Sequence, residues 1–186
     1  MLKTLLAAGA MAAALIASPA AAQVIERSED HFVLRHEIDL EYPPEDMWTA
    51  LGQIGEWWDS AHTYSGDASN MSVTLEPGAC FCERLADGTD FEHGRVVEAD
   101  PETGVLFDAP LGPLKGKATM ARWSVGWTGS PMGAGTRLVI TYVVRGPGVG
   151  AWSEGVDSVM RIQYGRYSHF MHYGETPAPS PPTPTP

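Results

Sequence analysis

Apolar and polar residues alternate along the segment FVLRHEIDLEY, which begins at Phe32. This alternation predicts a half-buried β-strand, because successive side chains of a strand point to opposite faces. The apolar face of this strand comprises Phe32, Leu34, His36, Ile38 and Leu40, whereas the other face is charged. Pro43 and Pro44 follow, and prolines there end a strand and suit the start of a helix.

Two short helices are expected between residues 43 and 58. Glu45 and Asp46 suit the positive end of a helix, and apolar residues follow at helical spacing. A second short piece carries Trp57 and Trp58. After a polar stretch, six short strands are predicted, separated by Gly, Pro and Asp turns. They cover residues 71–75, 80–86, 91–99, 105–108, 119–127 and 136–145.

Residues 149–172 show a different period. Their apolar side chains recur at helical spacing, with Glu154 and Asp157 early and Arg161, Arg166 and His172 late, which complements the helix dipole. The pattern predicts one long amphipathic helix. The order of elements defines an α+β fold, with a curved antiparallel sheet of about six to seven strands around the long C-terminal helix. The two short helices follow the first strand and close one end.

The two ends of the chain have their own compositions. Residues 1–22 carry Lys3, an apolar run and three alanines after Pro19, which is typical of a secretory signal peptide. The apolar run is shorter than the ~20 residues of a membrane span, so no membrane anchor is expected. Residues 175–186 are rich in proline and are predicted to form a disordered tail. The expected domain is therefore 23–174, exported into a bacterial periplasm.

The chain is acidic, with a formal net charge of −11 at pH 7. Loss of residues 1–22 would remove Lys3 alone among the charged residues and leave a net charge of −12. Such a surface repels nucleic acid and anionic lipid headgroups, so neither is expected as a partner.

Several segments together resemble the SRPBCC or START-like superfamily: PPEDMWTALGQIGEWW, LEPGACFCERLADG, HGRVVEADPETGVL, LGPL, GTRLVITYVV and VDSVMRIQYGRY. This superfamily includes polyketide cyclases, lipid-transfer domains, plant pollen allergens and a domain of heat-shock ATPase activators. The resemblance covers residues 32–171 and is closest to exported bacterial members. It implies a helix-grip fold in which the sheet and the long helix enclose a cavity, and it does not imply a reaction.

Both cysteines lie in the segment GACFCERLADGTDFEHGR, as Cys80 and Cys82. In a regular strand, residues two apart have Cβ atoms too far apart for a disulfide, so two free thiols in an apolar wall are the favoured interpretation. A disulfide stays an alternative because the expected compartment is oxidising. With an even-numbered hairpin loop, His93 would share the face of both thiols, which makes a zinc site the third alternative. Arg84 and Arg95 on that face would oppose a metal cation, and no metal or other cofactor is predicted.

Other titratable residues also have two interpretations. His36, alone on an apolar strand face, is typical of a hydrogen-bonded core histidine. Glu83 is expected at an edge or facing outward, although a buried carboxylate with a raised pKa is an alternative. Asp59 and His62 are expected to cap a helix or lie at the surface rather than to form an acid and base pair. No nucleophile elbow, phosphate loop or HExxH motif is present in the sequence.

The favoured function is an exported, non-catalytic carrier or sensor of a small apolar or aromatic molecule. Its candidate cavity residues are His36, Trp57, Trp58, Cys82, Glu83, His93, Trp123, Tyr142, Tyr164 and Tyr167. The first alternative is an enzyme of cyclase or dehydratase type, in which His36, Glu83 or His93 moves a proton. The second alternative is a protein-interaction module related to the heat-shock ATPase activators.

Overall fold

The structure is a computed structural model, and it describes residues 23–130, 133 and 135–178. The predicted signal peptide and the last residues of the predicted tail lie outside the described residues. The strands are β1 (Gln23–Ser28), β2 (His31–Leu40), β3 (Met71–Val73), β4 (Cys80–Arg84), β5 (Asp90–Asp100), β6 (Gly104–Asp108), β7 (Met120–Gly129) and β8 (Thr136–Arg145). The α-helices are α1 (Pro44–Gly52), α2 (Ile54–Trp57) and α3 (Ser153–Tyr173), and short 3-10 helices are η1 (Ser60–His62), η2 (Ala68–Asn70), η3 (Gly112–Leu114) and η4 (Val149–Trp152).

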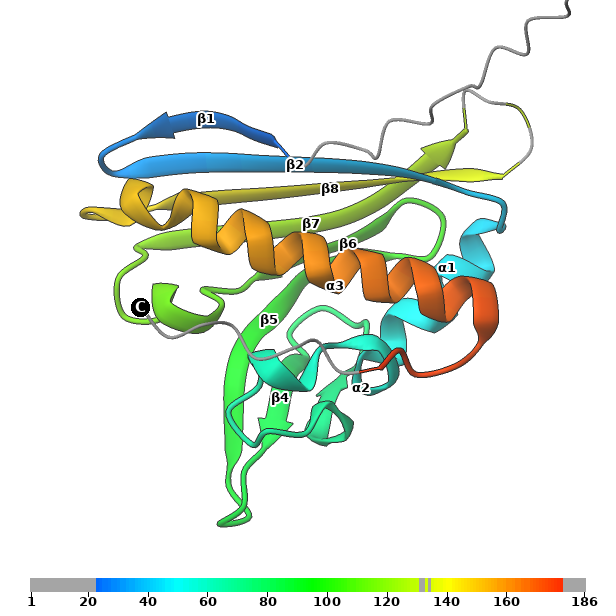
Figure 1. Cartoon of the computed structure of the whole chain (residues 1–186), viewed down its shortest axis with the longest axis horizontal. Coiled ribbons are helices and arrows are strands. Elements are labelled where there is room, and N and C mark those ends of the chain that lie inside the picture. The colour runs from blue at the N-terminus through cyan, green and yellow to red at the C-terminus, as the bar shows by residue number, and fades with distance from the viewer. Residues whose placement is uncertain (1–22, 131–132, 134, 179–186) are drawn as a thin grey trace, which may run out of the picture.

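The eight strands form one antiparallel sheet in the order β1-β2-β8-β7-β6-β5-β4-β3. In Figure 1 the sheet curves strongly, so that β5 and β4 run away from the long direction of β2 and β8. The α+β fold is therefore confirmed, and the sheet has one strand more than predicted. The additional strand is β1, whose sequence QVIERS shows no regular alternation of apolar and polar residues. This strand pairs at the sheet edge, with a register shift between Val24 and Glu26.

Helix α3 crosses the sheet, with its buried side facing the core (Figure 1). The predicted long helix is confirmed, with η4 forming its first turn. Helices α1 and α2 lie against the C-terminal half of α3 and close that end of the sheet, as predicted. Arg166 of α3 anchors this end, because its guanidinium donates hydrogen bonds to the carbonyl oxygens of Trp57, Trp58 and Pro177 at 2.9, 3.3 and 3.0 Å.

The hairpin of β4 and β5 differs from the expected register. Five residues separate the two strands, so Cys82 lies opposite Glu92, and Phe81 lies opposite Gly94. His93 is therefore the extra residue of a β-bulge. Both His93 and Gly94 are buried, because the bulge places two consecutive residues on the inner side of the sheet.

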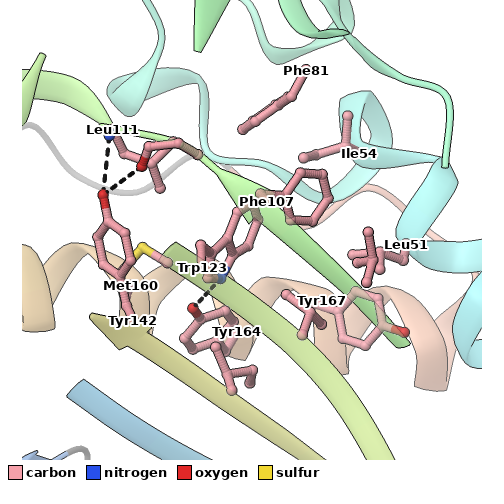
Figure 2. Packing of buried hydrophobic residues seen from close by; sticks show 14 of the residues in the cluster. Leu51, Ile54, Phe81, Phe107, Leu111, Trp123, Tyr142, Met160, Tyr164 and Tyr167 are labelled. Atoms are coloured by element: carbon pink, nitrogen blue, oxygen red, sulfur yellow. Dashed lines mark hydrogen bonds between the residues drawn. The ribbon is translucent and has the colours of Figure 1, made fainter. Parts of the chain in front are cut away.

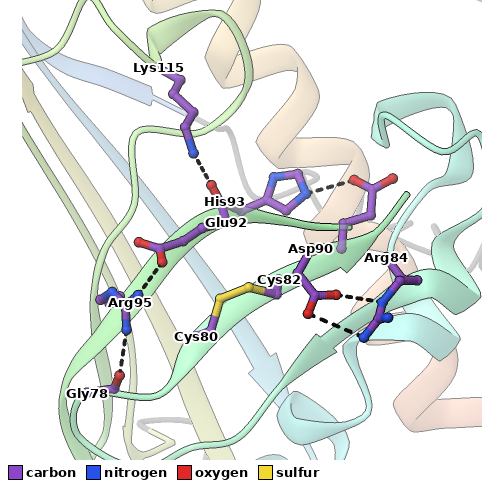
Figure 3. The surroundings of a disulfide bond; sticks show 10 residues. Gly78, Cys80, Cys82, Arg84, Asp90, Glu92, His93, Arg95 and Lys115 are labelled. Atoms are coloured by element: carbon purple, nitrogen blue, oxygen red, sulfur yellow. Dashed lines mark hydrogen bonds and ion pairs between the residues drawn. A yellow bond between two sulfur atoms is a disulfide. The ribbon is translucent and has the colours of Figure 1, made fainter. Parts of the chain in front are cut away.

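The prediction of two free thiols in a cavity wall is wrong, because Cys80 and Cys82 form a disulfide. Figure 3 shows this bond on the outer side of β4, away from His93. The strand is irregular at this point, and the two Cα atoms are 5.4 Å apart, shorter than the ~6.5 Å of a regular strand and within disulfide range. Cys82 therefore has no free thiol to line a cavity, and its sulfur atom and that of Cys80 do not converge with the imidazole of His93 on a metal.

Candidate functional site

The interior between α3 and the sheet is filled by the large aromatic side chains that the sequence places there. The hydroxyl of Tyr142 donates to the carbonyl oxygen of Ala109 at 2.7 Å and accepts from the amide of Leu111 at 3.1 Å. The indole N–H of Trp123 donates to the hydroxyl of Tyr164 at 2.9 Å (Figure 2). Each polar tip is thus satisfied inside the core, which is the usual condition for burying Trp and Tyr.

Trp57 and Tyr167 belong to the same packing. The Trp57 indole donates to the carbonyl oxygen of Ala50 at 2.9 Å, and the Tyr167 hydroxyl donates to that of Met47 at 2.8 Å. The space among Trp57, Trp123, Tyr164 and Tyr167 is only about 10 Å³. The prediction that Trp57, Trp123, Tyr164 and Tyr167 wall an open cavity therefore needs correction, because these four side chains pack around this small space. Tyr142 does not line it and is buried in the same core.

A larger pocket lies beside this core, with a volume of about 430 Å³. This volume falls within the ~300–1,000 Å³ of ordinary small-molecule sites. The pocket lies between the first half of α3, the segment that follows α2, and the loop that contains η3. It is lined by Trp58, His62, Thr63, Tyr64, His93, Leu111, Gly112, Pro113, Trp152, Gly155, Val156, Val159 and Met160.

The walls of this pocket are mostly apolar. One wall is the α3 surface of Val156, Val159 and Met160, and the facing wall includes Leu111 and Pro113. Of the predicted cavity residues, Trp58 and His93 line the pocket directly. The sequence pattern does not identify Val156, Val159 and Met160 as pocket residues, because a helical period alone does not show where along its length a helix leaves its sheet.

Glu83 and His93 form a buried hydrogen-bonded pair at the edge of the pocket. The Nε2 atom of His93 lies 2.8 Å from Oε2 of Glu83, and the two side chains are 4% and 0% exposed. The same carboxylate accepts hydrogen bonds from the backbone amides of Tyr64, at 3.1 Å, and Ser65. Glu83 is thus buried, contrary to the expectation of an outward-facing side chain, because a loop 18 residues away in sequence supplies two N–H donors to it.

The surroundings also set the charge of each partner. Burial opposes ionisation of Glu83, but hydrogen bonds from Ser65, Tyr64 and His93 outweigh it and hold the pKa of Glu83 below its ordinary value. Burial lowers the pKa of His93 below 6.5, although Glu83 acts in the opposite direction. At neutral pH the carboxylate is therefore charged and the imidazole is neutral.

Aromatic rings hold the His93 ring in place. Phe81 stacks on the imidazole with ring centroids 5.1 Å apart, and Phe91 meets it edge to face at 5.0 Å. Tyr64 lies on Phe91 at 4.2 Å, and its hydroxyl lies 3.5 Å from the carbonyl oxygen of Gly112. The imidazole is thereby fixed by a carboxylate at one nitrogen and by rings on its faces.

His36 lies elsewhere and has a different partner. Its Nε2 atom is 3.1 Å from Oδ1 of Asp157 on α3, and both side chains are buried. Burial lowers the pKa of His36, while Asp157 raises it in part. His36 is thus a core histidine that ties β2 to α3, and it does not line the 430 Å³ pocket. Asp59 caps η1 by accepting from the amide of Ala61, as the sequence predicted.

Two further properties concern metals and membranes. In the described part of the chain, no group of three or more His, Cys, Asp or Glu side chains is arranged to hold a metal ion. Within the same residues, no helix combines the length and the apolar character needed to cross a membrane.

The fold is shared with solved structures of very different sequence. No protein-family profile matches the chain, and no curated protein sequence matches it significantly. An uncharacterized protein from Rhizobium leguminosarum is 18% identical with a TM-score of 0.57, over 79% of this chain and 98% of that one. This likeness, together with the curved antiparallel sheet and the long C-terminal helix, shows that the chain has a helix-grip fold.

Two of the similar structures come from biosynthetic pathways. DynU16, encoded in the dynemicin biosynthetic locus, is 18% identical with a TM-score of 0.56, over 77% of this chain and 48% of that chain. The di-domain ARO/CYC protein BexL from the BE-7585A pathway is 17% identical with a TM-score of 0.51, over 84% of this chain and 53% of that chain. The chain therefore shares its fold with these two biosynthetic proteins, and at this level of identity the likeness concerns the fold alone.

Proposed function

We propose that this protein is an exported small-molecule-binding domain that holds an apolar or aromatic ligand in the pocket beside α3. The observation that carries the proposal is the 430 Å³ pocket itself, which combines an apolar lining with a buried, oriented histidine. Such a combination is typical of ligand sites, in which apolar walls supply affinity and a few polar groups supply orientation.

The export part of the proposal rests on two separate features. Residues 1–22 have the composition of a signal peptide, and the Cys80–Cys82 disulfide is of a kind that persists in oxidising compartments. Export into the periplasm predicts a mature chain that begins at Gln23. Its N-terminus, read by intact-mass spectrometry after secretion by a bacterial host, checks this directly.

A second candidate function is proton transfer in the same pocket, of the kind that a cyclase or dehydratase uses. The observation that favours it is the Glu83–His93 pair, because a neutral imidazole oriented by a carboxylate is a common general base. A carrier of the same ligand needs no such step. The binding function is therefore the primary proposal, and it is shared by both candidates.

The test fills the pocket without disturbing the core. Gly155 lines the pocket on α3, and a Cβ atom built on it meets no atom within 4 Å. Gly155→Phe should therefore place a ring at the pocket and weaken binding of the uncharged fluorescent probe N-phenyl-1-naphthylamine by about tenfold or more, equivalent to ~1.4 kcal/mol. Val159→Trp, at another lining position, should have the same effect.

The matched control is Gly165→Phe. Gly165 lies on the same helix, has equally open space around its Cβ position and does not line the pocket. Both glycine variants remove a flexible residue from a helix, so both should remain folded in thermal melts. If the wild type binds no apolar probe, or if Gly155→Phe and Gly165→Phe bind it equally well, the pocket is not the ligand site.

A further inference from the structure

The imidazole of His93 is a hydrogen-bonding group of the pocket whose orientation is fixed by a carboxylate outside the pocket lining. His93 lines the pocket, its Nε2 atom contacts Glu83, and its Nδ1 atom lies on the side of the ring away from that carboxylate (Figure 3). The hydroxyl groups of two other lining residues, Thr63 and Tyr64, are directed to the protein itself. The hydroxyl of Thr63 donates a hydrogen bond to the carbonyl oxygen of Ser60 at 2.8 Å, and the hydroxyl of Tyr64 lies 3.5 Å from the carbonyl oxygen of Gly112.

The partner of Nε2 determines what Nδ1 can do. An ionised carboxylate only accepts hydrogen bonds, and Glu83 already accepts two from backbone amides. Nε2 must therefore carry the proton and donate a hydrogen bond to the carboxylate of Glu83. In a neutral ring this leaves Nδ1 with a lone pair, so that the nitrogen is an acceptor and not a donor.

Resting on the proposed binding function, we propose that Nδ1 of His93 accepts a hydrogen bond from a hydroxyl group of the bound ligand. The pocket then selects aromatic molecules that carry an O–H donor, such as phenols and enols, over the same ring systems without it. A ligand carboxylate is disfavoured, because it would lie next to the buried charge of Glu83 and find an acceptor where it needs a donor. In this arrangement Glu83 is a positioning residue that fixes the tautomer of His93.

The test compares three coumarins, of which the hydroxyl and methoxy probes differ only in the group at C7. Binding of 7-hydroxycoumarin, 7-methoxycoumarin and coumarin-3-carboxylate is measured by calorimetry at a pH at which the absorption spectrum shows the neutral hydroxyl. The hydroxyl probe should bind about two- to tenfold more tightly than the methoxy probe, which is the net contribution of one hydrogen bond. The carboxylate should bind most weakly. His93→Phe keeps a ring of similar size and should equalise the hydroxyl and methoxy probes without weakening the methoxy probe.

A spectroscopic measurement separates positioning from a structural role. In protein labelled with ¹⁵N at histidine, the His93 signals should show the neutral tautomer protonated at Nε2. Addition of 7-hydroxycoumarin should shift the Nδ1 signal, whereas 7-methoxycoumarin should not. Glu83→Gln, which keeps the size of the side chain and removes its charge, should release this tautomer preference and reduce the selectivity for the hydroxyl probe, even if the thermal melting temperature is maintained.

The outcomes distinguish this proposal from the one on which it rests. Equal affinity for the hydroxyl and methoxy probes in the wild type, with N-phenyl-1-naphthylamine still bound, overturns the role of His93 and leaves the binding function standing. Tightest binding of the carboxylate overturns it as well, because the ring would then act as a cation. Absence of binding by any apolar probe overturns both. If His93→Phe fails to fold, Glu83→Gln and the ¹⁵N signals of the wild type still decide the question.

Discussion

Removal of the Cys80–Cys82 disulfide should destabilise the protein only modestly, because the bond closes a very small loop. The two cysteines are two positions apart, so the loop contains three residues. In the chain-entropy account, a loop of three residues restricts the unfolded chain by about 1.6 kcal/mol at 25 °C. For a domain of this size, that corresponds to a fall in melting temperature of about 3–6 °C.

The variant is Cys80→Ser combined with Cys82→Ser, and the assay is equilibrium urea unfolding with and without a reducing agent. Reduction should bring the wild type to the free energy of unfolding of the double variant, and it should leave the double variant unchanged. Thiol titration of unfolded, oxidised wild type should find no free sulfhydryl. Two free thiols after unfolding, or a loss of less than about 0.5 kcal/mol on reduction, would refute the reasoning.

Two further predictions concern the same region. Gly94→Ala should destabilise the protein by about 1–3 kcal/mol in the same urea assay, because the new Cβ atom would lie 2.4 Å from Cβ of Ala109 and 2.6 Å from the carbonyl oxygen of Asp108. The control Gly165→Ala should be neutral or stabilising, because a Cβ atom at Gly165 meets no atom within 4 Å. The pKa of His93 lies below 6.5 in the folded state, so the unfolded chain binds more protons and the free energy of unfolding should fall as pH falls from about 6.5. His93→Phe should lose less of its free energy of unfolding than the wild type between pH 7.5 and 5.5, and an equal loss in both proteins would contradict this.

Much of the fold could be predicted because one face of most strands is buried. In β7 and β8, buried and partly buried residues alternate along most of each strand, which is the pattern that a period of two indicates. Helix α3 was equally clear, because its buried residues recur at helical spacing. Strand β1 was missed because its sequence is mostly polar and it pairs at the edge of the sheet, where little apolar surface is buried.

The site was harder to predict, because it depends on volumes and on distant partners. The number of aromatic residues indicated an aromatic interior, but composition does not show whether Trp123 and Tyr164 surround a space or fill it. Glu83 was expected to face outward, since a buried carboxylate is costly without donors. Its donors are backbone amides of Tyr64 and Ser65, which leave no mark in the sequence.

The β-bulge at His93 explains why Arg95 lies on the outer side of the hairpin while His93, two residues earlier, lies on the inner side. Regular pairing beyond Glu92 would leave His93 on the inner side, opposite Phe81, and would also place the charged side chain of Arg95 on the buried side. The extra residue reverses the alternation, so that His93 and Gly94 both face inward and Arg95 faces outward, opposite Cys80. Gly94 is required at this point, because β5 passes too close to Ala109 for any larger side chain. The short sequence EHGR is thus compatible with an inward histidine and an outward arginine only two residues apart, and the bulge keeps the charge of Arg95 out of the buried side on which His93 lies.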